Sequence, residues 1–346
     1  MLYVVLFFTF FSFFLYVLLG GADFGAGIIE LFSSKEDKRV TRDTAYSVMG
    51  PVWEANHIWL IILIVVLWIG FPAYFNVIVI YLHIPFVLIL LGITMRGVAF
   101  IFRHYDAVVD KSQYTYNWMF RISSFITPVF LGMAFGALIG GRIILTDDYA
   151  DFSFYDIFMQ PWLNVFTFLV GLFYAALCAF MASTLLIGET EGAVRKMFSR
   201  KSASYTIWLV VLGLVLIGYG YFAKVEFIRD FVENPVSIAA IALSALLLIP
   251  LWRSIRRQNR IWSRYLAGLQ VVLVLFAAIY AHFPYIIITA GKELNLLEGR
   301  APDQVIQNLG IMLLIGGLVI LPGLFHLMRS FSMIKILERG KGEMEQ

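Results

Sequence analysis

Long apolar runs alternate with short polar segments along the whole chain. A helix needs about 20 apolar residues to cross the hydrocarbon core of a bilayer, and nine segments are close to that length. The pattern predicts an all-α, polytopic membrane protein with nine transmembrane helices, arranged as two four-helix bundles plus one helix. Between the second and third spans, Gly70-Phe71-Pro72 predicts a tight hairpin. The predicted spans are residues 2–23, 52–70, 73–95, 118–141, 161–187, 205–222, 236–252, 265–290 and 305–328.

Composition supports this class. The chain of 346 residues is 61% hydrophobic and 14% charged, whereas soluble domains are about half apolar and a quarter charged. No loop is long enough to fold separately, so residues 1–346 are predicted to form a single membrane domain. The chain has no phosphate-binding glycine-rich loop ending in Lys-Ser or Lys-Thr, which argues against an ATP-driven machine.

Basic residues occur mainly in alternate loops. Of the 26 Lys and Arg residues, 20 fall in the odd-numbered loops with their flanking helix ends and in the C-terminal tail, and 5 fall in the even-numbered loops. Cytoplasmic loops carry the excess of Lys and Arg, so the N-terminus is predicted outside and the C-terminus in the cytoplasm. The arginine cluster at residues 253–264 then faces lipid headgroups, and no nucleic-acid partner is predicted.

Three ionisable residues, Asp23, Glu54 and Arg96, lie in or against the apolar runs. A charge inside a membrane span costs about 2.5 to 3.5 kcal/mol on insertion scales, so such residues usually have a function. Given the predicted topology, all three converge on the inner half of the membrane. Glycines beside Asp23, at positions 20 and 27, allow another helix to approach closely.

Two interpretations of these charges remain open. Two carboxylates beside one arginine leave one negative charge that a single proton would neutralise, which suits a proton relay through Glu54, Asp23 and His57. Alternatively, Arg96 clamps the carboxylates and locks three helices together, since structural ion pairs occur as well. Asn56 could order water near Glu54, and Trp53 has the amphipathic character of an interfacial residue.

Metal ligation is not predicted. Cys178 is the single cysteine and falls within the fifth span, so an intrachain disulfide cannot form. The five histidines are scattered and no Cys-x-x-Cys-His motif is present, so no haem is assigned to this chain. The histidines are His57, His83, His104, His282 and His326.

Three motifs in the first hundred residues resemble subunit II of the cytochrome bd ubiquinol oxidase family. They are GADFGAG at Gly21–Gly27, PVWEANHIWLI at Pro51–Ile61 and RGVAF at Arg96–Phe100. Glu54 stands where many relatives have Asp, so the acid is retained with one more methylene. Beyond about Arg121 the likeness is mainly one of hydropathy and length.

The resemblance implies a role in a terminal oxidase that oxidises quinol and reduces oxygen to water in the cytoplasmic membrane of a bacterial or archaeal cell. It implies that a partner, subunit I, carries two b-type haems, haem d and the quinol site, and that a single-helix accessory subunit often joins them. It also implies that subunit II supports assembly, lends an acid to the cytoplasmic proton path and, in some members, holds a structural quinone.

Two other classes of function are weighed against this one. A proton-coupled secondary transporter also needs acids inside the membrane, but transporters usually show paired broken helices near the midplane in two repeats. The charges here cluster in the first three spans only. A non-catalytic membrane scaffold is the third interpretation.

Overall fold

The computed structural model describes the chain except residues 50–52, 106–111, 147–150, 292–293 and 331–346. Within these described residues all regular secondary structure is helical, apart from an isolated bridge that pairs Ile143 with Thr289. The all-α prediction is therefore confirmed for this part of the chain. The first helix is interrupted by a π-helical turn, η1, which separates α1 from α2. The elements are α1 Leu2–Leu15, η1 Tyr16–Gly20, α2 Gly21–Leu31, α3 Lys35–Met49, α4 Trp53–Gly70, α5 Pro72–Tyr81, α6 His83–Tyr105, α7 Ser112–Ile139, α8 Phe154–Phe158, α9 Val165–Glu189, α10 Gly192–Phe222, α11 Glu226–Glu233, α12 Pro235–Arg256, α13 Arg260–His282 and α14 Asp303–Ser330.

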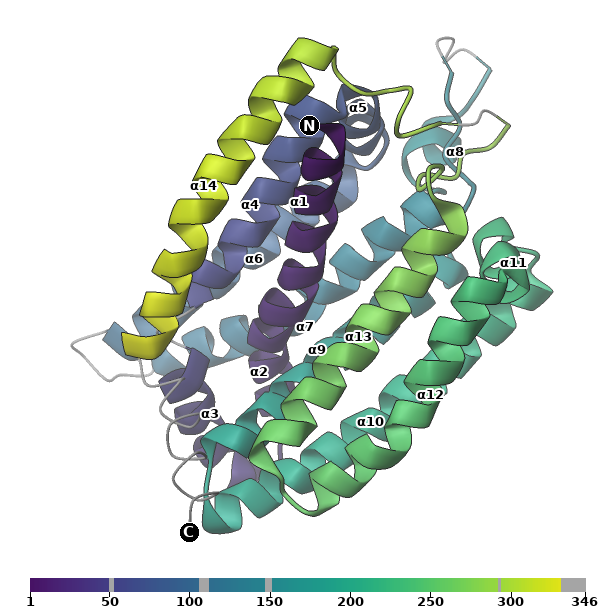
Figure 1. Cartoon of the computed structure of the whole chain (residues 1–346). Helices are drawn as coiled ribbons and strands as arrows, with labels where there is room; N and C mark the ends of the chain where they lie inside the picture. The colour runs from purple at the N-terminus through teal and green to yellow at the C-terminus, as the bar shows by residue number, and fades with distance from the viewer. Residues whose placement is uncertain (50–52, 106–111, 147–150, 292–293, 331–346) are drawn as a thin grey trace.

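Eight helical segments in the described residues are long and apolar enough to cross a membrane, and the bent pair α4 and α5 provides a ninth. The helix formed by α1, η1 and α2 packs with α4, α6 and α7, and the helices α9, α10, α12 and α13 form a second group. Helix α14 packs against α1 and α4 at the side of the first group (Figure 1). Helix α9 also packs against α2 and α7, so the structure confirms the all-helical membrane fold, and the division into two four-helix bundles plus one helix stays a prediction.

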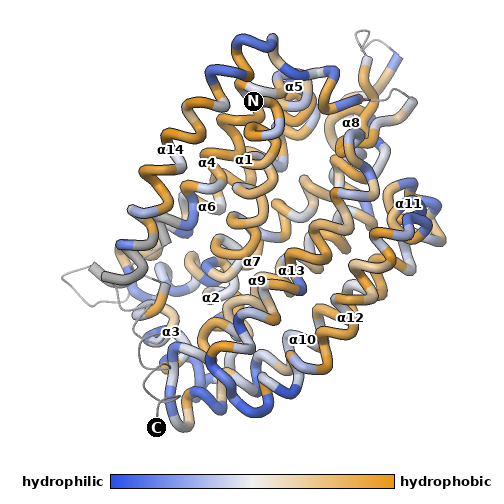
Figure 2. Tube along the Cα trace, viewed as in Figure 1, coloured by the Kyte–Doolittle hydropathy of each residue, from blue (hydrophilic) through white to orange (hydrophobic). Residues whose placement is uncertain are grey.

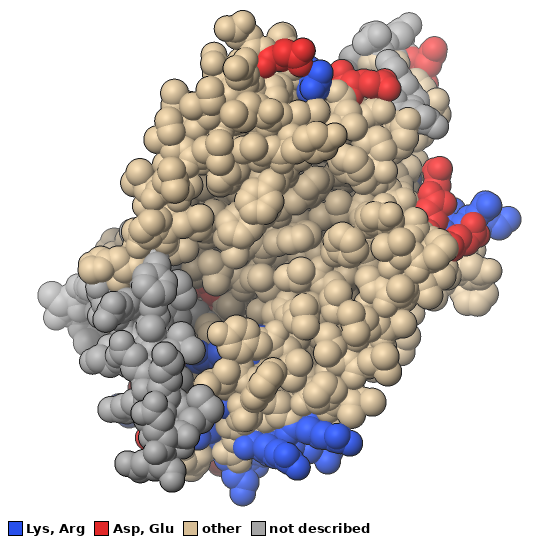
Figure 3. All heavy atoms as spheres, in the orientation of Figure 1, with Lys and Arg blue, Asp and Glu red and all other residues tan. Residues whose placement is uncertain are grey.

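Apolar residues dominate the helix shafts, and hydrophilic residues gather at the two ends of the molecule (Figure 2). Lys and Arg lie mainly at the end where α12 turns into α13, and most of the visible Asp and Glu lie toward the opposite end (Figure 3). We call the first of these the basic end; α3 and the end of α2 also lie there (Figure 1). The chain is thus a multi-pass membrane protein with a charge asymmetry between its two ends.

The predicted hairpin at Gly70-Phe71-Pro72 is wrong. Helix α4 ends at Gly70, and α5 begins at Pro72 with its axis bent by 114° from that of α4. The helix that returns across the membrane is α6, which begins at His83, so the third span runs ten residues later than predicted. Pro72 suits the first turn of α5, where its missing N–H has no partner to lose.

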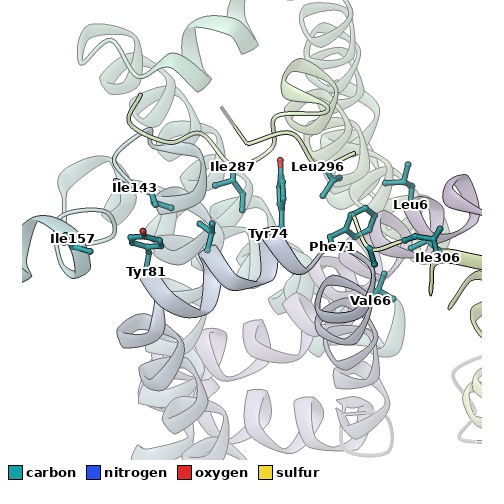
Figure 4. Packing of buried hydrophobic residues seen from close by; sticks show 13 residues of the cluster. Leu6, Val66, Phe71, Tyr74, Tyr81, Ile143, Ile157, Ile287, Leu296 and Ile306 are labelled. Carbon is teal, nitrogen blue, oxygen red and sulfur yellow. The ribbon is translucent and has the colours of Figure 1, made fainter. Parts of the chain in front are cut away.

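Packing explains why α5 turns aside. Its aromatic side chains join a buried apolar cluster with the loop that precedes α14 (Figure 4). The hydroxyl of Tyr74 donates to the carbonyl oxygens of Pro284 at 3.1 Å and Leu294 at 2.7 Å. These contacts are made by residues more than 200 positions away, so local periodicity cannot show them.

Glycines on α2 set its distance from the neighbouring helices. A Cβ atom at Gly25 would collide with the backbone carbonyl of Cys178 on α9, and one at Gly27 would collide with the side chain of Ser124 on α7. Small residues allow such close backbone approach in membranes. Helix α2 is therefore wedged between α7 and α9, and the acidic residues that it carries are buried in protein.

Candidate functional site

The carboxylate of Asp23 on α2 meets the guanidinium of Arg96 on α6. The Nη1 of Arg96 donates to Asp23 Oδ2 at 2.5 Å, and Nη2 donates to the backbone oxygen of Asp23 at 2.9 Å. The Nε of Arg96 donates to Ser124 Oγ on α7 at 3.0 Å. The two charged side chains are almost completely buried, with exposed fractions of 1% and 4%. Arg96 therefore ties three helices together through all three of its nitrogen atoms.

Aromatic rings shield this ion pair from water. The Cζ atom of Arg96 lies 5.0 Å from the ring centre of Phe24 and 5.1 Å from that of Phe120. Removing a charge pair from water costs several kcal/mol per ion, and good geometry with additional hydrogen bonds offsets that cost. The backbone and hydroxyl acceptors around Arg96 supply these bonds. The predicted meeting of Asp23 and Arg96 is confirmed.

Helix α4 brings the remaining predicted residues to the same region. The Nε2 atom of His57 lies 3.7 Å from Asp23 Oδ2, which is close for a charge interaction but too long for a hydrogen bond. Asn56 is buried. The side chains of Trp53 and Glu54 lie outside the part of the chain that the structure describes. Since Glu54 precedes His57 by three residues, its Cα lies about one helical turn before that histidine.

A second buried ion pair, which the sequence analysis missed, lies two helical turns from the first. The Nη2 of Arg103 donates to Glu30 Oε2 at 2.6 Å, and both side chains are 3% exposed. Arg121 on α7 places its Nε 3.9 Å from the other oxygen, Oε1, of Glu30. The Cζ atom of Arg103 lies 4.7 Å from the ring centre of Phe120, so this ring separates Arg103 from the Arg96 guanidinium.

Matched spacing is the sequence signal that could have revealed the second pair. Asp23 and Glu30 are seven residues apart on one helix, and Arg96 and Arg103 are seven residues apart on another. Seven residues are close to two helical turns, about 10 Å along the axis, so each set lies on one face. The predicted third span ended at residue 95, which placed Arg103 in a loop. The later position of α6 brings it into the helix.

The buried charged residues of the structure differ from the set that the sequence predicted. The described residues contain two buried carboxylates, Asp23 and Glu30, and three buried arginines, Arg96, Arg103 and Arg121. Every carboxylate faces at least one guanidinium, and one positive charge is left over among these five residues. One more ionised acid at this site, or one proton added or removed, changes its net charge by one unit.

Three of the described histidines have polar neighbours in the structure. The Nε2 of His282 lies 3.0 Å from the carbonyl oxygen of Phe227, and the Nδ1 of His83 lies 2.9 Å from that of Ile80. His57 faces Asp23. Among the described residues, no three His, Cys, Asp or Glu side chains gather as a metal site. Cys178 is buried in α9.

A groove of about 530 Å³ lies between α1, α4 and α14, and its lining is mostly apolar. Its lining includes the buried Trp59 and the polar, exposed residue Asn308. Ligand sites commonly combine such a volume and an apolar wall with a few polar groups.

Comparisons with known proteins agree with this picture. The family model described as cytochrome bd terminal oxidase subunit II matches residues 1–331. The cytochrome bd ubiquinol oxidase subunit 2 of Bacillus subtilis is 25% identical over 305 residues, which cover 85% of this chain and 84% of that protein. The putative cytochrome bd menaquinol oxidase subunit II of the same organism is 24% identical, over 92% of each chain.

The fold is also similar to a solved structure. A chain of the bd oxidase from Geobacillus thermodenitrificans superposes with a TM-score of 0.74 and 18% sequence identity, covering 95% of this chain and 98% of that one. At this identity the likeness concerns the fold. It supports the helix arrangement over nearly the whole length of the chain.

Proposed function

Because the chain belongs to the cytochrome bd terminal oxidase subunit II family, we propose that it is the second subunit of a membrane-bound quinol:oxygen oxidoreductase. Its partner is a subunit I that carries two b-type haems, haem d and the quinol site, with a single-helix accessory subunit as a further candidate. In this complex the chain supports assembly and conducts protons from the basic end toward the partner. The observation that carries the proton role is the buried Asp23–Arg96 pair beside His57.

The proton path begins at Glu54 in this proposal. Glu54 is near the start of α4, and the next turn carries His57, which lies against Asp23. Asn56 and His57 can order water or relay protons between the basic end and the interior of the first bundle. An ionised Glu54, together with Asp23 and Glu30, would balance the charge of the three buried arginines. One proton added to this neutral site would then change its net charge by one unit.

A structural quinone is part of the proposal as well. The groove between α1, α4 and α14 has room for an isoprenoid tail, and the amide of Asn308 offers a donor to a quinone carbonyl oxygen. The printed names of the relatives differ in their quinol, ubiquinol in one and menaquinol in the other. The head group is therefore left unspecified.

The absorption spectrum of the native complex tests the function. If the chain is an oxidase subunit, the complex purified through this chain should show the bands of haem b and haem d and should consume oxygen when quinol is added. A complex without haem bands and without quinol-dependent oxygen uptake would contradict the proposal. It would favour the scaffold or transporter interpretation.

The isolated chain is expected to bind no haem stoichiometrically. The sequence has no Cys-x-x-Cys-His motif, and its five histidines are scattered along the chain. The chain should be expressed without subunit I, purified in detergent and examined by the pyridine haemochrome assay. Tightly bound haem that is lost on replacing His57 or His83 would show that the cofactors have been misassigned.

The basic end is expected to face the cytoplasm. The split of 20 to 5 between the Lys and Arg residues of alternate loops orients the helices in this way. A fluorescent protein fused after Gln346 should therefore fluoresce and a phosphatase there should be inactive, whereas a tag before Leu2 should be labelled from outside. The reverse result at either terminus would refute the assigned orientation.

A further inference from the structure

The turn from α12 to α13 carries a cluster of positive charge at the basic end. From the start of α12 to the end of α13 the sequence holds five arginines and no Asp or Glu. Two of them, Arg260 and Arg264, pair with glutamates where α9 turns into α10. The other three are exposed and form no salt bridge within the described residues. We call these three, Arg253, Arg256 and Arg257, the α12 arginines.

The α12 arginines lie on one face of the helix. Residues three and four positions apart are neighbours on a helix surface, so Arg256 and Arg257 both lie beside Arg253. The guanidinium of Arg256 is placed over the ring of Trp252, with its Cζ atom 5.1 Å from the ring centre. Tryptophan is typical of the level where a membrane meets water. An anion at this level therefore meets three neighbouring guanidinium groups.

Hydrogen bonds fix the turn that follows these arginines. The backbone N–H of Asn259 donates to the carbonyl oxygen of Ser254 at 3.0 Å, and the hydroxyl of Ser199 on α10 donates to that of Ile255 at 2.6 Å. The side chain of Asn259 accepts from the backbone N–H groups two and three residues later. Because Asn259 occupies these N–H groups of α13, recognition of an anion here falls to the arginine side chains.

The same face of α12 continues into the membrane as an exposed apolar stripe. Ile249 and Leu246 precede Arg253 by four and seven residues, spacings that keep them on its side of the helix. Their side chains are 54% and 64% exposed. Helix α13, which packs against α12, exposes Trp262 and Tyr265 in its first two turns. The surface thus has a cationic upper part, an aromatic border and an apolar lower part.

We propose that this face of α12 binds one anionic phospholipid from the leaflet at the basic end. The α12 arginines bind its phosphate, and its acyl chains lie along Leu246 and Ile249. Guanidinium groups match phosphate oxygens through paired, charge-assisted hydrogen bonds, and basic clusters beside a membrane span favour anionic lipids. A zwitterionic lipid brings its own cation toward the unpaired arginines, which repel it. The inference does not depend on the proposed oxidase role.

The apolar stripe favours a lipid over a free anion or an acidic protein segment. Free phosphate would use the guanidinium groups alone and would leave Leu246 and Ile249 without a function. An acidic segment that approaches from the aqueous side would not reach these two residues, which lie one and two helical turns farther into the span of α12. A phospholipid contacts both parts of the surface at once.

The test measures lipid binding by the complete complex, purified in detergent through this chain and analysed by native mass spectrometry. Lipid-depleted complex is titrated with phosphatidylglycerol and, in parallel, with phosphatidylcholine of the same chain length. A third series adds inorganic phosphate to the complex with bound phosphatidylglycerol. The first variant replaces the three α12 arginines by glutamine, and the second replaces them by lysine.

A matched control removes the same charge from another helix at the same end. It replaces three basic residues of α3 by glutamine, and there acids alternate with the bases along the helix. If only the overall surface charge attracts lipid, this control and the glutamine variant of α12 should lose equal affinity. The control residues are Lys35, Lys38 and Arg39.

Wild-type complex should bind one phosphatidylglycerol and prefer it to phosphatidylcholine. The glutamine variant of α12 should bind phosphatidylglycerol on the order of a hundredfold more weakly, the combined effect of three basic residues at an anionic lipid surface. The lysine variant should bind it several-fold more weakly, because an ammonium group keeps the charge but lacks the paired donors of a guanidinium. The α3 control should keep the wild-type affinity, and inorganic phosphate should not displace the lipid.

Equal losses in the glutamine variant of α12 and the α3 control would overturn the inference, as would equal binding of the two lipids. Wild-type affinity in the lysine variant would also overturn it. Displacement by inorganic phosphate would assign the surface to a free anion instead. Should the glutamine variant fail to assemble, the lysine variant decides, since it keeps every positive charge. The haem bands and oxygen uptake of the wild-type complex test the oxidase role separately.

Discussion

Replacement of Glu54 by glutamine should lower quinol-dependent oxygen uptake on the order of a hundredfold, the scale on which positioned proton-transfer groups act. Glutamine keeps the shape of the side chain but cannot exchange a proton with water. The position opens α4 one turn before His57, which lies 3.7 Å from the Asp23 carboxylate. Removing the acid there interrupts the relay at its entrance. Oxygen electrode rates and proton uptake in vesicles measure the effect.

The same variant separates the relay from the clamp. Assembly and haem content should stay near wild type, because glutamine occupies the same volume and can still hydrogen-bond. Glu54→Asp should keep much of the activity, since the family resemblance implies that Asp serves at this position. If Glu54→Gln turns over at the wild-type rate with full charge separation, the acid is a structural anchor.

Replacement of Asp23 by asparagine should mainly reduce the amount of assembled complex. The substitution leaves the Arg96 guanidinium, 4% exposed, without its carboxylate. Removing one partner of a buried ion pair typically costs about 3 to 5 kcal/mol, because the other charge remains buried and uncompensated. That is a large fraction of the stability of most domains. The complex recovered per milligram of membrane, and its thermal unfolding midpoint, are the measurements.

Two further variants show whether the loss comes from the charge pair. The double variant Asp23→Asn with Arg96→Gln should recover part of the yield, since neither charge is then unpaired. Arg229→Gln breaks the exposed pair with Glu233 on α11, whose side chains are 69% and 64% exposed; exposed pairs of this kind contribute little. Equal losses from Asp23→Asn and Arg229→Gln would refute the argument from burial.

The chain order of the apolar runs was enough to predict that Asp23 and Arg96 meet. If the first span begins outside, the first and third spans both end on the cytoplasmic side, however the helices pack against one another. The structure brings Asp23 and Arg96 into contact at 2.5 Å, although both residues lie within their helices and not at the ends. Of the two glycines that predicted a close helix contact, Gly27 meets Ser124 on α7, whereas Gly20 faces Tyr16 of its own helix. The close contact with α9 is at Gly25.

The register of the third span could not be predicted in the same way. Residues 72–81 are as apolar as a membrane span, and hydropathy does not record the direction in which a helix points. The bend of 114° depends on the packing of Tyr74 and its neighbours against a loop far along the chain. Because this bend was not predicted, the third span was placed ten residues too early. Arg103 then fell outside the predicted helix, and its pairing with Glu30 was not recognised.

The sequence by itself determined the membrane class, the helix content and the convergence of Asp23 with Arg96, because these follow from apolar length and chain order. Only the tertiary structure decided that α5 turns aside and that Glu30, Arg103 and Arg121 form a second buried cluster. The physical reason is that such pairings depend on the rotation and depth of each helix against its neighbours. Long-range packing sets these two quantities, whereas the seven-residue spacing of the charges shows only which residues share a helix face.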